Sequence, residues 1–61
     1  MLTYARYKYK NDVMGKVLGT EWYLVTSEKM TYYPSGRHNT LIINGYAVKA
    51  KHCDVVQVFI K

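Results

Sequence analysis

The run His52-Cys53-Asp54 holds the three residue types that cysteine hydrolases combine as base, nucleophile and orienting carboxylate. These residues are consecutive, and neighbouring side chains on a strand or turn point apart. A catalytic chain needs side chains that converge in space. We therefore interpret Cys53 as a small buried apolar residue and expect no enzymatic activity.

Metal chemistry finds no support in the spacing of the possible ligands. His38, His52 and Cys53 form no C-x-x-C or H-x₃-H pair, which is the spacing typical of zinc ligands. The carboxylates are too scattered to form a paired site: Asp12, Glu21, Glu28 and Asp54. We expect neither a bound metal nor another cofactor.

The strongest pattern for binding is Tyr4-Ala5-Arg6-Tyr7-Lys8-Tyr9-Lys10, which alternates with a period of two as a strand does. One face of that strand would carry Tyr4, Arg6, Lys8 and Lys10. The other would carry Thr3, Ala5, Tyr7 and Tyr9. We expect the first face to be an exposed cationic ribbon for an anionic partner, and Tyr7 and Tyr9 to lie in the core.

A second candidate is the segment 34–39, Pro-Ser-Gly-Arg-His-Asn, read as a loop. Gly and Ser let backbone amides converge, and the Arg37 guanidinium is suited to a phosphate. His38 would gain charge below about pH 6.5 and strengthen binding to an anion. The alternative is an ordinary polar turn, for which these residue types are common.

Aromatic and basic residues elsewhere extend the candidate surface. Trp22 and Leu24 share strand parity and are expected in the core, which leaves Tyr23 exposed and able to stack on bases. The alternative is that tyrosine simply suits a half-buried strand. Lys49 and Lys51 also share parity and would enlarge the basic face.

Composition limits the protein to one small domain. The chain has 61 residues, of which 49% are hydrophobic and 21% charged, so a folded core is expected. Nine Lys and Arg against four Asp and Glu give a net charge of +5, which favours nucleic acid or an acidic protein, although solubility alone is an alternative reason. We predict a cytoplasmic protein that does not bind a membrane. The sequence has a single cysteine, no signal-peptide pattern and no apolar run of membrane length.

The residue pattern predicts strands and no amphipathic helix. Asn44-Gly45 between β-type runs indicates a two-residue type I′ hairpin. Gly15 and Gly19 suggest that 13–18 is a bent or bulged apolar segment, and 50–54 reads as one tight, 3₁₀-type turn. The apolar run 55–60 is predicted to be a central strand, or one buried on both faces at a barrel corner. The other strand-like runs are 2–10, 21–27, 30–33, 40–43 and 46–48.

This order of strands and turns resembles a small SH3-like barrel of five to six antiparallel strands. The strands would be 4–10, 21–27, 40–43, 46–49 and 55–60, with the hairpin at Asn44-Gly45 and the short turn before the last strand. A five-stranded oligonucleotide-binding barrel is the alternative fold. The acidic loop of signalling SH3 domains is missing, so the likeness is to the basic SH3-like barrels of ribosomal, transcriptional and viral regulatory proteins.

The resemblance and the charge together imply a non-enzymatic protein that binds DNA or RNA by backbone charge and stacking. The alternative is an inhibitor or adaptor, as found among viral and mobile-element regulators, that binds an acidic protein surface. A structural subunit of a larger particle is a third possibility. An open edge strand would also allow homo-oligomers.

Overall fold

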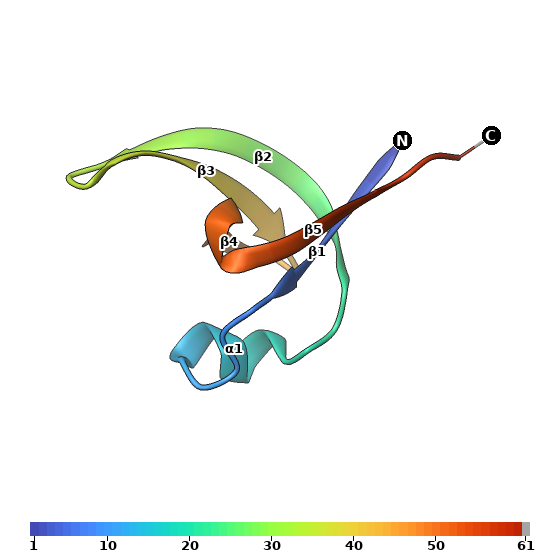
Figure 1. The fold of residues 1–61 in the computed structure, drawn as a ribbon, viewed down its shortest axis with the longest axis horizontal. Coiled ribbons are helices and arrows are strands. Elements are labelled where there is room, and N and C mark those ends of the chain that lie inside the picture. The colour runs from blue at the N-terminus through green and yellow to red at the C-terminus, as the bar shows by residue number, and fades with distance from the viewer. Residues whose placement is uncertain (61) are drawn as a thin grey trace.

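Five antiparallel strands form a single sheet in the computed structural model, which describes residues 1–60 and leaves Lys61 outside the described part (Figure 1). The strand order is β4-β3-β2-β1-β5, and a 3₁₀ helix, η1 (Ala50–His52), precedes β5. The strands are β1 (Leu2–Tyr7), β2 (Tyr23–Tyr33), β3 (Gly36–Ile43), β4 (Tyr46–Lys49) and β5 (Cys53–Val58). The predicted all-β class, with five antiparallel strands and one 3₁₀ turn before the last strand, is confirmed.

The hairpin between β3 and β4 forms where the sequence predicts it. Asn44 and Gly45 both have positive φ, 49° and 81°, as a type I′ turn requires. Ile43 pairs with Tyr46 across this turn, and Leu41 pairs with Val48. The local turn chemistry therefore sets the register that buries Leu41 and Val48 together.

The β2–β3 hairpin is longer than the sequence indicates and projects from the body as an arm (Figure 1). β2 continues through Glu28-Lys29, where a turn was expected, because β3 pairs with it along its whole distal half. The predicted loop 34–39 is wrong: only Pro34 and Ser35 form the turn, and 37–39 belong to β3. A register shift between Val25 and Ser27 breaks the ladder at the base of the arm.

A short helix, α1 (Val13–Leu18), replaces the bulged segment predicted there. The Asp12 carboxylate caps it by accepting the Gly15 N–H at 2.7 Å, and Gly19, with φ of 69°, ends it. Six residues are too few for a helical apolar period to show in the sequence. Leu18 is the buried anchor of α1, since Val13 and Val17 remain exposed. No helix among residues 1–60 has the length and apolar character to cross a membrane.

The buried core is small and draws on every strand except β2, together with α1. Tyr7 and Cys53 are buried as predicted. Tyr9 is not: β1 ends at Tyr7, so the alternation stops and the Tyr9 side chain is 48% exposed. The fully buried side chains are Leu18, Leu41 and Ile43, around which Ala5, Tyr7, Val48 and Cys53 pack.

β5 is an edge strand, and its prediction as a central strand is wrong. It stands at the end of the strand order and pairs only with β1. Beyond Asp54 its side chains are exposed, because no strand or helix covers this part of the sheet. An apolar run signals burial only when a neighbouring element exists to supply it.

Candidate functional site

Three of the four residues of the predicted cationic ribbon, Arg6, Lys8 and Lys10, line one depression together with Asp54. Arg6 donates from Nη2 to Asp54 Oδ2 at 3.1 Å, and its guanidinium lies 4.7 Å from the centre of the Trp22 ring. Tyr4 is half-buried and pairs with Leu24 and Val56 on the same outer face of the sheet. Arg6 is therefore engaged within the fold, and Tyr4 belongs to an apolar surface.

Trp22 and Tyr23 have exchanged their predicted environments. Trp22 is 41% exposed, whereas Tyr23 packs against the core. The Tyr23 hydroxyl donates to the Leu18 carbonyl at 2.8 Å and lies 3.3 Å from Glu21 Oε2. Burial, and then the Glu21 carboxylate, raise the pKa of Tyr23. The expectation of an exposed, base-stacking Tyr23 is wrong, because α1 covers the face on which it lies.

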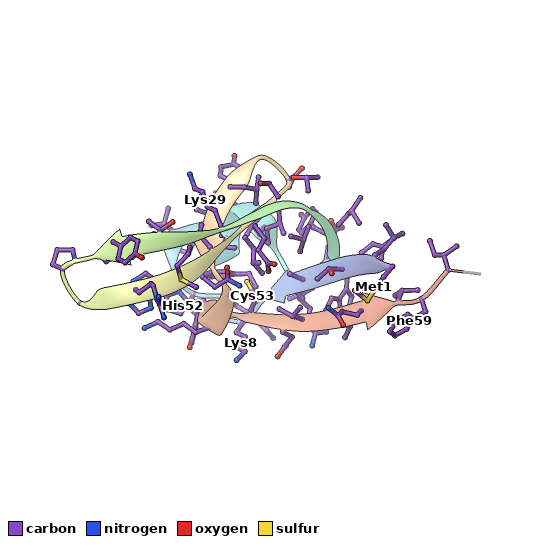
Figure 2. All side chains as sticks on the ribbon, turned by 90° about the horizontal axis from the view of Figure 1, so that it is seen from above. Met1, Lys8, Lys29, His52, Cys53 and Phe59 are labelled. Carbon is purple, nitrogen blue, oxygen red and sulfur yellow. The ribbon has the colours of Figure 1, made fainter. Side chains whose placement is uncertain are left out.

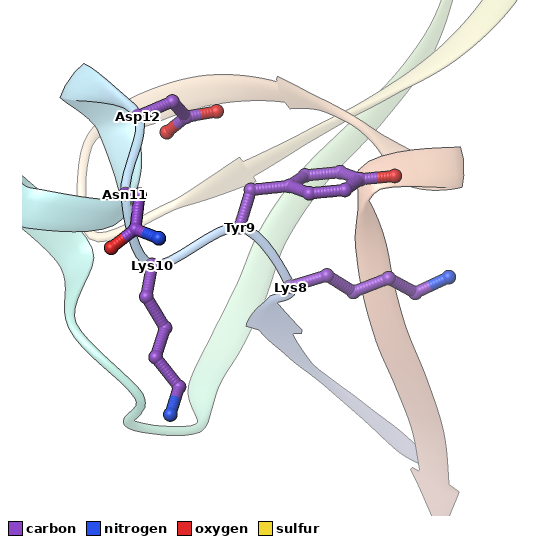
Figure 3. A pocket seen from close by; sticks show the side chains of 5 residues that line it. All are labelled: Lys8, Tyr9, Lys10, Asn11 and Asp12. Carbon is purple, nitrogen blue, oxygen red and sulfur yellow. The ribbon is translucent and has the colours of Figure 1, made fainter.

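Lys8 and Lys10 leave the strand and diverge. Lys8 follows the end of β1, and its backbone N–H donates to the His52 carbonyl at 2.9 Å. Figure 3 shows the Lys8 and Tyr9 side chains running side by side toward η1, while Lys10 points elsewhere. A shallow depression lies between Lys8 and Asp12. Lys8 therefore contacts η1 through its backbone, and both lysines line the same depressions.

Residues from five segments meet beside η1 and form what we call the basic corner. Its cations come from the turn after β1, the end of β4 and η1. Its aromatic rings come from the same turn, from η1 and from the β2–β3 arm. The residues of the basic corner are Lys8, Tyr9, Tyr33, His38, Lys49, Lys51 and His52. Figure 2 shows Lys8 and His52 on the same side of the molecule.

Aromatic rings and cations alternate in the basic corner. The Lys49 Nζ lies 4.5 Å from the centre of the Tyr33 ring, and the His38 ring lies 5.5 Å from the same centre. On the other side, the Tyr9 and His52 rings meet edge to face at 5.3 Å. Tyr9 is 48% exposed and Tyr33 37% exposed, so both rings remain partly open to a ligand.

The electrostatics of His38 report this concentration of positive charge. Burial is the largest cause that lowers the pKa of His38, and Lys51, Lys49 and His52 lower it further. His38 Nε2 also lies 3.1 Å from Ser35 Oγ at the turn of the arm. Segment 34–39, predicted to be an anion-binding loop, therefore holds His38 on a strand, facing the lysines of β4 and η1.

Arg37 lies on the opposite face of the arm from His38. It pairs with Tyr32, whereas His38 pairs with Thr31, and directly opposed residues share one face of a sheet. Arg37 and Tyr32 are both exposed. The fold therefore separates the two residues that the sequence analysis placed together in a loop.

The carboxylates are committed elsewhere. Asp12 accepts the Tyr7 hydroxyl at 2.7 Å and caps α1, and Glu28 accepts Asn39 Nδ2 at 3.2 Å. Arg6–Asp54 is the one ion pair within residues 1–60. The lysines of the basic corner are consequently not neutralised by an ion pair within the described chain.

Three members of the basic corner were not among the predicted binding residues: Tyr9, Tyr33 and His52. In the sequence, Tyr9 lies between two lysines, Tyr33 precedes a proline and His52 precedes a cysteine. Only the fold brings these three residues together. Among residues 1–60, no three His, Cys, Asp or Glu side chains are grouped to hold a metal ion. Comparison with family models, curated proteins and solved structures finds no match to this chain. The chemistry of the basic corner is therefore the guide to function.

Proposed function

We propose that this protein binds nucleic acid through the basic corner, without catalysis, by contacting phosphates with Lys8, Lys49 and Lys51 and by stacking on Tyr9 and Tyr33. Phosphate contacts supply affinity without regard to sequence, and aromatic rings add base stacking where bases are accessible. The exposed Lys10 and Arg37 lie outside the corner and would supply additional, peripheral phosphate contacts.

One observation carries the proposal: Lys49 lies over the Tyr33 ring while His38, Lys51 and His52 crowd the same place. Of these groups, Lys49 and Lys51 carry like charges beside a partly exposed ring, and they repel each other in the free protein. An anionic ligand would relieve that repulsion, because it would place negative charge among the cations. A surface that served solubility alone would gain nothing from such crowding.

The test is fluorescence anisotropy with labelled single-stranded and duplex oligonucleotides across a series of salt concentrations. We expect log affinity to fall linearly with log salt, by about 0.7 to 0.9 for each phosphate contacted. The double variant Lys49→Gln, Lys51→Gln should bind more weakly and reduce the slope by roughly that amount for each contact removed.

The matched control is Lys16→Gln with Lys29→Gln, which changes the net charge equally at α1 and on the β2 strand of the arm. This control should keep most of the affinity and the slope. Equal losses in both double variants would show a diffuse charge effect and contradict a specific corner. Affinity that does not change with salt would contradict nucleic-acid binding altogether.

The second candidate, an inhibitor or adaptor that binds another protein, is favoured by a different feature. The outer face of β5, β1 and β2 exposes an apolar surface beside the neutralised Arg6–Asp54 pair: Leu2, Tyr4, Leu24, Val56 and Val58. Such patches are common at protein interfaces. In the same experiment, no oligonucleotide binding together with a stoichiometric partner recovered after nuclease treatment would favour this candidate.

A further inference from the structure

The hydrogen-bonding phase of β5 can be derived from one contact. Lys8 N–H donates to the His52 carbonyl, so Lys8 and His52 form a hydrogen-bonded pair of the antiparallel ladder. Such pairs alternate, which makes Arg6–Asp54 and Tyr4–Val56 the next ones along the register. The residues between them, Cys53, Val55 and Gln57, must therefore direct their N–H and C=O groups away from β1, toward the open edge.

That open edge lacks the features that usually prevent strands from pairing. Residues 55–60 carry no charge, no proline and no glycine in a chain whose net charge is +5. Val55 is 45% exposed. Phe59 and Ile60, which extend beyond the start of β1 at Leu2, are 78% and 63% exposed. Figure 2 shows Phe59 near Met1, at the end of the molecule away from His52.

We propose that β5 pairs with β5 of a second copy of this chain, antiparallel and about a two-fold axis at Gln57. In this register the two Gln57 residues exchange their outward backbone hydrogen bonds, as the phase of the ladder requires. Val56 then lies opposite Val58 of the other copy, and Val55 opposite Phe59. The sheet becomes continuous, and the apolar outer faces of the two copies join.

The self-complementary register and the absence of charge on residues 55–60 favour the second copy as the occupant. Two proteins of net charge +5 repel over most of their surfaces, but residues 55–60 bring no charge into this contact. Because β5 pairs with itself in opposite directions, the two basic corners lie at opposite ends of the joined strands. An acidic partner, by contrast, would find no cation on this strand to bind.

The other open edge is less suited to pairing. β4 has four residues, carries Lys49 and leads directly into η1. A short edge strand with a lysine is a common way to block edge-to-edge pairing. A symmetric contact through β5 alone closes on itself and gives a dimer rather than a filament.

The experiment uses sedimentation velocity on the full chain at micromolar to millimolar concentrations. We expect a monomer–dimer equilibrium that Gln57→Pro shifts at least tenfold toward monomer. Proline removes the outward N–H of residue 57 and leaves the ladder to β1 intact, so the fold should survive. The matched control, Gln57→Ala, removes the side chain but keeps the N–H, and should dimerise as the wild type does.

A second variant keeps the proposal falsifiable if Gln57→Pro unfolds. Val58→Lys places a charge opposite Val56 of the other copy, and Val13→Lys places the same charge on exposed α1. The first should abolish the dimer and the second should not. The proposal would be overturned if the wild type stayed monomeric at all concentrations or if the dimer survived Val58→Lys. It would also be overturned if larger open assemblies formed, or if only a strand of another protein paired with this edge.

Discussion

At the scale of single residues, Asp12 connects the strand, the helix and the core. Its carboxylate accepts the buried Tyr7 hydroxyl and the Gly15 amide, and these two bonds, in that order, lower the pKa of Asp12. The same hydrogen bond, together with burial, raises the pKa of Tyr7 to about 12. One short contact thus moves the titration of Asp12 to more acidic pH and that of Tyr7 to more alkaline pH.

The pH dependence of stability follows from the directions of these two shifts. A carboxyl with a lowered pKa stabilises the fold above its unfolded value of 3.8, and that stabilisation is lost as the pH falls through the folded pKa. Asp12→Asn should therefore flatten the acid side of the melting-temperature profile. Asp12→Ala should lower the melting temperature at pH ~7 more than Asp12→Asn, because asparagine still caps α1.

The alkaline side provides the check on this pair. Tyr7 has a raised pKa, so its contribution is complete below pH 10.0 and disappears as the pH rises toward about 12. Tyr7→Phe should remove that alkaline loss while retaining the ring in the core. Melting profiles of wild type and variants that coincide at both ends of the pH range would show that the Tyr7–Asp12 bond does not form in solution.

At the scale of elements, α1 can pack closely against the turn before it because Gly15 has no side chain. A Cβ atom there would overlap the carbonyl oxygen of Tyr9 and crowd the backbone of Lys10. The turn that positions Lys8 and Tyr9 in the basic corner therefore depends on a glycine in the helix that follows it.

Gly15→Ala should destabilise the protein, although alanine is normally the better helix former. We expect the free energy of unfolding to fall by about 1–3 kcal/mol, the usual range for an overpacked site, since the obstacle is backbone and not a flexible side chain. Chemical denaturation measures this, with Lys16→Ala on the exposed side of α1 as the control. A stabilised Gly15→Ala protein would mean that the turn and α1 separate readily.

At the scale of the whole molecule, separate cations act together on His38. Burial lowers its pKa first, and Lys51, Lys49 and His52, from η1 and the end of β4, lower it further. No acid of the described chain is among the causes of this shift, and Tyr33 and Ser35 supply its neutral contacts. His38 is therefore neutral at pH 7 in the free protein, and its protonation requires a more acidic solution than the reference value of 6.5.

A bound phosphate backbone should reverse this effect. If nucleic acid occupies the basic corner, its charge favours protonated His38, so affinity should rise severalfold between about pH 7 and about pH 5.5. Anisotropy titrations at several pH values measure the rise, and His38→Gln should reduce it. Because His52 lies in the same corner, His52→Gln is the companion variant. A pH-independent affinity in the wild type would contradict the placement of the ligand beside His38.

Short-range chemistry controls the parts of the fold that can be predicted from the sequence. Asn44-Gly45 specifies its turn because both residues accept positive φ, and the alternation of Ala5 and Tyr7 places both in the core. Cys53 was correctly expected to be buried. The all-β class and the 3₁₀ turn before the last strand follow from the same local preferences and are confirmed.

Which elements lie side by side depends on long-range contacts, and these contacts changed the candidate site. The sequence predicts that Arg6 is exposed and free to bind an anionic partner. Asp54 lies far along the chain, but the pairing of β1 with β5 brings it beside Arg6, and the two form an ion pair. Tyr23 faces inward because α1, too short to be predicted, covers it. The basic corner and the open β5 edge both depend on contacts between residues distant in sequence, and no local pattern encodes those contacts.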